Sequence, residues 1–192
     1  TSNYNGTTLW GDNLGGTSIN PVFAQLTDAN SSNLVSVNST DTLHVEGTNI
    51  VYNAVTFSKK VIVIGTGYFL NENPDVSNTV SEAQVQYVTF STGSEGSQLI
   101  GLHIGNSPYG ITIDVSNILI KRCRIDYNIT VNYNISDVFV LQNFFSNTAN
   151  NTSSAILCSP YGFLTKFIFD NTICKKTLLI STFATDVYTA EE

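Results

Sequence analysis

Three consecutive segments share one pattern: ITIDVSNILIKRCRI (111–125), ITVNYNISDVFVLQNFF (129–145) and ILCSPYGFLTKFIFDNTI (156–173). Each segment begins with a short apolar triplet, passes through a polar turn and ends with a second apolar run. Together with the preceding run QLIGLHI (98–104), these runs end at Ile104, Ile125, Phe145 and Ile173, which are 21, 20 and 28 residues apart. A repeat of this length, built from short strands and tight turns, predicts a solenoid.

Other all-β architectures fit the repeat less well. A propeller blade needs about 40 residues or more. A β-sandwich needs longer strands joined by hairpins, and the only Asn-Gly or Asp-Gly hairpin signal is Asn5-Gly6, near the start of the chain. In a solenoid, each coil contributes short strands that pair in parallel with the coils above and below, about 4.8 Å away.

The composition is that of one acidic, weakly charged β domain. The chain has 192 residues, of which 42% are hydrophobic and only 12% charged, with a net charge of −7. This charge disfavours nucleic acid as a partner, and no apolar run reaches the ~18–20 residues of a membrane span. We expect a secreted or cell-surface protein, and the start at Thr1 fits a processed secreted chain or one with a trimmed terminus.

The chain divides into three parts by composition. Residues 1–22 predict a loop or edge segment, residues 23–182 a single β-helix domain, and residues 183–192 a C-terminal tail. Within residues 21–33, Phe23 and Leu26 at helical spacing after Pro21 predict a short helix that caps the first coil. Residues 65–84 form the longest irregular segment, and such loops are usually functional or lid-like.

The segment VTFSKKVIVIGTGYFLNENP (55–74) resembles the first coils of secreted bacterial β-helix proteins. With the repeats and the predicted helix, the chain resembles right-handed parallel β-helix repeat proteins of the pectate-lyase-like superfamily. The resemblance implies an all-β, right-handed parallel β-helix with a short N-terminal capping helix. This superfamily includes lyases, hydrolases, phage tailspikes and adhesins, so the resemblance says little about function.

Some positions of the repeat have structural explanations. The residues two before the ends of the last three runs are Cys123, Asn143 and Asn171, which predict a stacked ladder that satisfies backbone groups at a turn. The cysteines, Cys123, Cys158 and Cys174, match no zinc pattern. They are interpreted as small buried residues, with one Cys158–Cys174 disulfide as the alternative.

Two groups of side chains are candidates for ligand binding. Lys121, Arg122 and Arg124 form the only basic cluster, next to His103 of the preceding coil, and are candidates for holding a uronate or sulfate group. A solvated or ion-paired strand face explains them as well. Asp114 and Asp126 are candidates for a carboxylate pair of the glycosidase kind, or else cap turns.

A further observation concerns threonine. Thr112 and Thr130 occupy equivalent positions of two repeats, but Leu157 replaces threonine in the third. A regular threonine array would suggest ice binding, and two positions do not make an array.

The sequence therefore leads to three hypotheses for function. The first is a non-catalytic β-helix with a structural, adhesive or self-assembling role, in which the ends of the solenoid contact other copies. The second is a carbohydrate-active or glycan-binding module that acts on polysaccharide. The third is a phage or virus fibre component. No catalytic residue or metal site is assigned and no cofactor is expected, with Ca²⁺ as the one possible ion.

Overall fold

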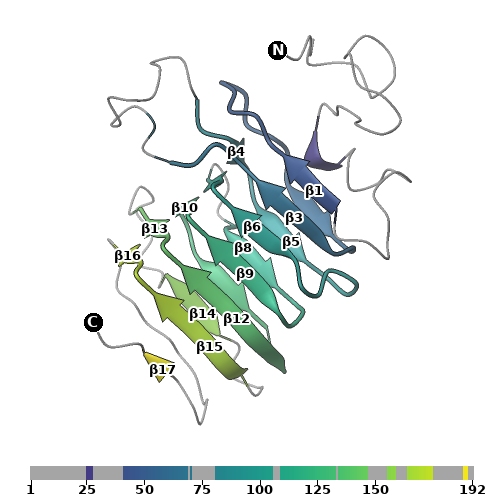
Figure 1. Ribbon diagram of the computed structural model, residues 1–192, viewed down its shortest axis with the longest axis vertical. Coiled ribbons are helices and arrows are strands. Elements are labelled where there is room, and N and C mark those ends of the chain that lie inside the picture. The colour runs from purple at the N-terminus through teal and green to yellow at the C-terminus, as the bar shows by residue number, and fades with distance from the viewer. Residues whose placement is uncertain are drawn as a thin grey trace.

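The computed structural model describes residues 25–27, 41–68, 70, 81–105, 109–132, 134–146, 155–158, 164–174 and 188–189. Within these residues the regular structure consists almost entirely of short strands, and every strand pairing is parallel. Figure 1 shows the strands stacked in layers along the long axis of the molecule. The prediction of an all-β chain with stacked parallel strands is confirmed.

The strands form three parallel sheets. Sheet A contains, in spatial order, β1 (Asp41–His44), β3 (Val61–Ile64), β6 (Gln98–Ile100), β9 (Ile118–Lys121), β12 (Ile135–Leu141), β15 (Leu164–Asp170) and β17 (Tyr188–Thr189). Sheet B contains β4 (Gln84–Val85), β7 (His103–Ile104), β10 (Arg124–Ile125), β13 (Phe144–Phe145) and β16 (Ile173–Cys174). Sheet C contains β2 (Val55–Phe57), β5 (Val88–Phe90), β8 (Ile111–Ile113), β11 (Ile129–Val131) and β14 (Ile156–Cys158).

From β2 to β16 the chain visits sheets C, A and B repeatedly in this order. The apolar triplet of each repeat is the strand of sheet C, and the second apolar run contains the strands of sheets A and B. Each repeat is therefore one coil of a solenoid-like stack, and each of its strands lies on the equivalent strand of the next coil.

The core lies between the three sheets and consists of the inward side chains of each strand. Because neighbouring residues of a strand point to opposite faces, one column of inward residues runs along each sheet. In sheet B this column is Val85, Ile104, Ile125 and Phe145, all with 0% exposure. Burying one such side chain contributes roughly 1.5–3 kcal/mol, so the stack is held mainly by these columns.

Two columns of residues with positive φ run across sheet A. One consists of Gly96 and Asn117, which precede β6 and β9, and of Asp137 and Lys166, which are the third residues of β12 and β15. The other follows directly after the strands and consists of Gly101, Arg122, Gln142 and Asn171. Left-handed backbone turns the chain sharply, and glycine and asparagine adopt it most readily. In these four coils the corners are therefore built at fixed positions, five residues apart.

The last coil differs from the predicted register by one residue. Phe145 pairs with Cys174, not with Ile173, so the predicted interval of 28 residues is one residue too short. A slip of one residue moves a side chain to the opposite face, and Ile173 is accordingly 61% exposed. The predicted ladder of Cys123, Asn143 and Asn171 is therefore wrong at its last position. Asn171 is level with Gln142, and Thr172 is the residue level with Asn143.

The ends of the chain lie largely outside the described residues. Of the predicted capping helix, only 25–27 are described; Leu26 and Thr27 have helical backbone, and no capping helix is seen in this part. Leu26 is buried in the core, and Gln25 Oε1 accepts a hydrogen bond of 2.9 Å from the backbone N–H of Asn53. β17 lies within the predicted C-terminal tail.

Two further expectations can be compared with the described residues. Cys123 and Cys158 are buried free thiols, so the alternative of a Cys158–Cys174 disulfide is wrong. Burial in an apolar core raises the pKa of Cys123 to about 12 and that of Cys158 to about 11. In the described part of the chain, no helix has the length and apolar character needed to cross a membrane.

Candidate functional site

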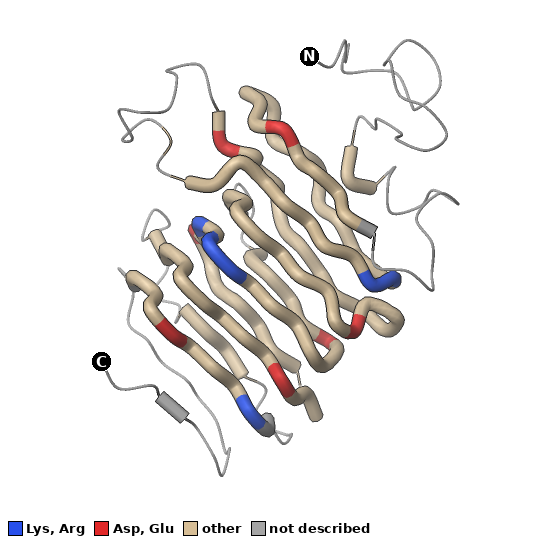
Figure 2. The backbone as a smooth tube through the Cα atoms, viewed as in Figure 1, with Lys and Arg blue, Asp and Glu red and all other residues tan. Residues whose placement is uncertain are grey.

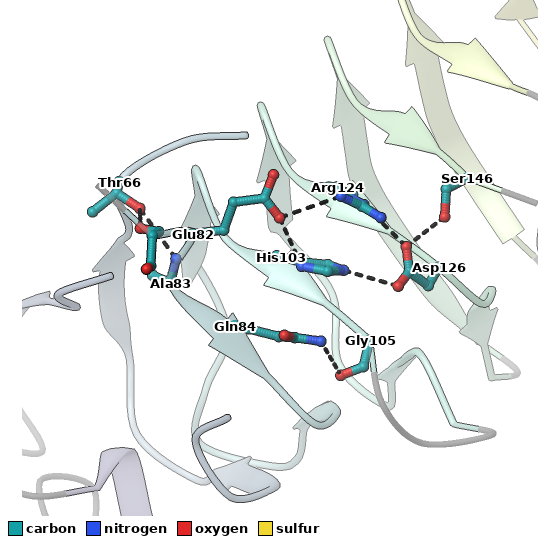
Figure 3. Close-up of polar contacts among 10 residues, drawn as sticks. Thr66, Glu82, Ala83, Gln84, His103, Gly105, Arg124, Asp126 and Ser146 are labelled. Carbon is teal, nitrogen blue, oxygen red and sulfur yellow. Dashed lines mark hydrogen bonds and ion pairs between the residues drawn. The ribbon is translucent and has the colours of Figure 1, made fainter. Parts of the chain in front are cut away.

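Among the described residues, the largest cluster of charged side chains lies on the outer face of sheet B, over β7 and β10 (Figure 3). His103 and Arg124 are register partners in neighbouring coils, so their side chains leave the sheet next to each other. Glu82 reaches them from the segment just before β4, and Asp126 from the turn just after β10. The cluster therefore combines residues from three successive coils.

His103 lies between two carboxylates. Its Nδ1 is 2.8 Å from Glu82 Oε2, and its Nε2 is 2.8 Å from Asp126 Oδ2. Arg124 bridges the same two acids: its Nε donates to Asp126 Oδ1 at 3.2 Å, and its Nη1 lies 3.4 Å from Glu82 Oε2. With His103 protonated, two positive and two negative groups balance, and His103 is only 7% exposed.

The positions that stack on Asp126 make this arrangement possible. In the next coil the equivalent residue is Ser146, whose hydroxyl donates a short hydrogen bond to Asp126 Oδ1. In the preceding coil it is Gly105, where an added Cβ would collide with Asp126 Oδ2 and lie 2.9 Å from His103 Nε2. Glycine on one side leaves room for the imidazole, and serine on the other side supplies a donor.

The two central groups are held in their charged forms. Burial alone would lower the pKa of His103, but its hydrogen bonds to Asp126 and Glu82 outweigh burial and raise the pKa. Burial alone would raise the pKa of Asp126, but hydrogen bonds from His103 and Ser146, with the charges of His103 and Arg124, lower it to about 2. These contacts therefore favour the charged forms of both groups, in which the charges of this ion network balance.

This geometry is poorly suited to acid–base or metal chemistry. A general base needs an unprotonated ring nitrogen directed at a substrate, whereas both ring nitrogens of His103 face carboxylates. Ser146 donates to Asp126, so serine, histidine and aspartate do not form the relay of a hydrolytic triad. Within the described residues, no group of three or more ligand-type side chains is arranged to hold a metal ion.

No protein-family model, no curated protein and no solved structure matches this chain. What the chain does has to be inferred from its own side chains.

The three basic residues of the predicted cluster lie on different surfaces. Lys121 is on the outer face of sheet A, Arg122 is exposed at the corner after β9, and Arg124 joins His103 on the outer face of sheet B. In Figure 2, where Lys and Arg are blue, the basic residues occupy short stretches of the described backbone. Only Arg124 is thus brought next to His103, and the three do not form one anion site.

The two candidate carboxylates also belong to separate surroundings. Asp114 is exposed after β8, in sheet C, and accepts a short hydrogen bond from the side-chain amide of Asn132 in the next coil. Asp126 belongs to the ion network on sheet B. The side-chain contact described for Asp114 therefore joins two neighbouring coils of sheet C.

Asn143 performs the task expected of a ladder residue, but its partners are in the coil below. Its side-chain amide donates to the carbonyl of Ile120 at 3.0 Å, and its side-chain oxygen accepts from the backbone N–H of Cys123 at 2.9 Å. Thr172 Oγ1 accepts from the backbone N–H of Asn143 at 3.2 Å. This buried amide therefore satisfies backbone groups that the corner leaves without strand partners.

A groove of about 460 Å³ lies at the corner between sheets A and B. Its lining includes Tyr68, Arg122, Gln142, Asn143, Asn171 and Ile173. Tyr68 reaches over from the segment after β3: its ring stacks on Phe144 at 6.2 Å, and its hydroxyl donates to the carbonyl of Gln142 at 3.2 Å. Arg122 Nε donates to Gln142 Oε1 at 3.1 Å. An aromatic ring, a guanidinium and amides thus border one depression.

The sequence did not predict several residues of the ion network on sheet B and of the groove between sheets A and B. Ser146 was accessible from the repeat, because it follows Phe145 as Asp126 follows Ile125. Glu82 and Tyr68 lie in or beside the long irregular segment, where no repeat fixes which coil they reach. That segment contributes Glu82 to the ion network and Tyr68 to the groove.

Sheet C has more threonines in register than the sequence repeats reveal. Thr56, Thr89, Thr112 and Thr130 are successive register partners at the centres of β2, β5, β8 and β11, and Leu157 ends the column. They form a single column, since each strand contributes one outward residue between two inward ones.

Proposed function

We propose that this chain is a non-catalytic β-helix with a structural or adhesive role outside the cell or at its surface. The observation that carries the proposal is the position of His103 between Glu82 and Asp126, both at 2.8 Å. The most elaborate polar cluster in the described part of the chain is used internally, to neutralise a buried face of sheet B. A weakly charged chain rich in small polar residues fits an extracellular setting.

The proposal includes a finer assignment of the fold, to the right-handed parallel β-helices of the pectate-lyase-like superfamily. The repeated order of sheets C, A and B supports it. Crossovers between parallel strands are right-handed in nearly all known cases. The segment 55–74 supplies the sequence resemblance.

Contact between solenoid ends is part of the proposed role. Within the described residues, β14 and β16 are the last strands of sheets C and B. A strand edge without a partner is a template for another chain, and head-to-tail contacts that do not close produce filaments. Sedimentation velocity and negative-stain imaging test this: growing oligomers or fibrils are expected, and a trimer of fixed size would instead favour a fibre component.

The absence of catalysis is tested by incubating the protein with acidic and neutral polysaccharides, with and without Ca²⁺. We expect no new reducing ends and no unsaturated products. Product formation that disappears in both His103→Gln and Asp126→Asn, with folding retained by circular dichroism, would overturn the proposal.

Glycan binding is the second candidate function, and the groove beside Tyr68 and Arg122 favours it. Aromatic rings stack on sugar faces, and guanidinium and amide groups bind hydroxyls and carboxylates. Isothermal titration with acidic and neutral oligosaccharides tests the groove. Binding that is lost in Arg122→Ala but kept in Thr112→Ala would support it, whereas equal binding by both variants would exclude the groove.

A further inference from the structure

The outer face of sheet A carries a continuous apolar surface. In each of the sheet A strands β3, β6, β9, β12 and β15, at least one outward residue is a large apolar side chain that is half-buried. These residues are Ile62, Ile64, Ile100, Leu119, Phe139, Leu141 and Ile168. This face is turned toward the viewer in Figure 1, with sheet C behind it. Apolar residues grouped in this way on a flat sheet commonly mark an interaction surface.

Two charges stand at symmetrical positions on this face. Lys121 of β9 and Asp170 of β15 are both register partners of Leu141 in β12, one on each side. Neither side chain has an ion-pair partner among the described residues. They are two strands apart, roughly 10 Å, and so do not pair with each other.

The neighbouring outward column has the same symmetry. Phe139 of β12 lies between its register partners Leu119 and Ile168. The centre of the face therefore has an apolar pair, Phe139 and Leu141, on the middle strand. Each neighbouring strand carries one apolar residue and one charged residue at the same two levels. The charge on β9 is positive and the charge on β15 is negative.

From this pattern we infer that the outer face of sheet A pairs with the same face of a second copy, about a twofold axis that passes between the two β12 strands along the strand direction. This rotation reverses the order of coils and keeps the direction of the strands. Leu141 and Phe139 then meet their own copies, Leu119 meets Ile168, and Lys121 meets Asp170 twice. A twofold contact must be self-complementary, and the outward columns through Phe139 and Leu141 satisfy this in both apolar character and charge. At the border, Asp137 of β12 meets its own copy, and each Asp137 is neutralised by Lys166 of its own chain.

The contact is small and lies beside a charged border. Two packed sheets are about 10 Å apart, and three strands cover much less than the ~800 Å² per partner of a standard interface. At the border, Lys166 Nζ lies 3.1 Å from Asp137 Oδ1 and 5.2 Å from the centre of the Phe139 ring. We therefore expect a weak dimer, with a micromolar to millimolar dissociation constant.

This lateral dimer goes beyond the proposed function, because it forms whether or not the solenoid ends associate and whether or not the groove binds glycans. It is a closed pair, whereas end contacts produce open-ended oligomers.

Charge reversal with sedimentation equilibrium, up to ~1 mM protein, tests the inference. Wild type is expected to dimerise, and Lys121→Asp and Asp170→Lys should each weaken the dimer at least about tenfold, because each opposes like charges at two places. The double variant Lys121→Asp/Asp170→Lys restores both ion pairs and should recover the wild-type constant within about threefold. Thr112→Asp, on the outer face of sheet C, is the matched control and should dimerise as wild type does.

Three results would each overturn the inference. They are a wild-type protein that stays monomeric throughout this range, a double variant no tighter than the single variants, and a Thr112→Asp variant as weak as Lys121→Asp. Growth beyond the dimer that ignores all these substitutions would point to the solenoid ends instead.

Discussion

Sheets A and C have the same inward side and different outward sides. Inward, both present Val, Ile, Leu or Phe at almost every position, and these side chains are buried except for Leu43 and Phe169, in β1 and β15 of sheet A, which are partly buried. Outward, sheet A carries isoleucine, leucine and phenylalanine, whereas the central outward residue of four strands of sheet C is threonine. The inward residues are required by the stack, because they fill the space between three sheets. The outward residues are not, so their difference is the better guide to function.

The largest expected effect comes from breaking the inward side within one strand of sheet C. Phe90 has 0% exposure and its ring stacks on Phe57 at 5.8 Å. Phe90→Ala should lower the free energy of unfolding by about 3–5 kcal/mol, because it leaves a cavity in the stack. The outward neighbour Thr89 provides the control: Thr89→Ala should change the free energy of unfolding by less than about 0.5 kcal/mol. Urea unfolding measures both, and similar losses would contradict the assignment of faces.

The next effect concerns a polar residue that points inward. Asn143→Ala leaves the carbonyl of Ile120 and the N–H of Cys123 without their partner, and should cost about 1–3 kcal/mol. Gln142→Ala, one residue earlier and half-exposed, should cost well under half as much. Unfolding of both variants under the same conditions gives the comparison, and an equal cost would mean that the amide of Asn143 is not needed by the corner.

The ion network on sheet B adds a pH-dependent contribution to stability. The pKa of Asp126 is lowered from 3.8 to about 2 by hydrogen bonds and charges that overcome burial. Its ionised form therefore stabilises the fold above pH 3.8, by about 2 kcal/mol. This contribution should be lost as the pH falls from about 5 toward 2. Asp126→Asn should flatten the acid limb of a plot of unfolding free energy against pH; an unchanged limb would contradict the network.

His103 acts in the opposite direction. Its pKa is raised above 6.5 by Asp126 and Glu82 despite burial, so its contribution is complete below pH 6.5 and is lost as the pH rises through the folded-state pKa. His103→Gln should remove the alkaline decline and also make the acid limb shallower, because His103 supplies a hydrogen bond and a charge that lower the pKa of Asp126. Nitrogen chemical shifts of the imidazole, followed against pH, give the folded-state pKa directly, and a value below 6.5 would refute the geometry.

The smallest effect is expected at the corners of sheet A. Asn117 has a φ of 63° and is exposed. Asn117→Val should cost about 1–2 kcal/mol because a β-branched residue resists left-handed backbone. Asn117→Gly should be close to neutral. Thermal unfolding of the two variants is the measurement, and equal melting temperatures would count against a fixed corner at this position.

The stacking of coils could be predicted from the sequence because its pattern repeats. The register of the last coil and the contacts made by irregular segments could not, because no repeat determines them. Apolar triplets and runs in residues 98–145 follow the coil interval, and the structure pairs them in that register. In the last coil, both Ile173 and Cys174 are apolar, so the sequence does not say which one points inward. Only one of these two neighbours of His103 could be predicted from the sequence. Arg124 follows from the coil interval, whereas Glu82 comes from an irregular segment whose path depends on tertiary packing.

The central claim is that each coil lies in register on the next, and the threonines of sheet C report on it directly. With threonine methyl groups labelled, and assigned by single Thr→Ser changes, nuclear Overhauser effects should connect Thr56 to Thr89, Thr89 to Thr112, and Thr112 to Thr130. Neighbouring strands are about 4.8 Å apart and next-nearest strands about twice that, so Thr56–Thr112 and Thr89–Thr130 contacts should be absent. An unbroken chain of these three contacts is the predicted result. A missing link, or a contact that skips a strand, would contradict the account.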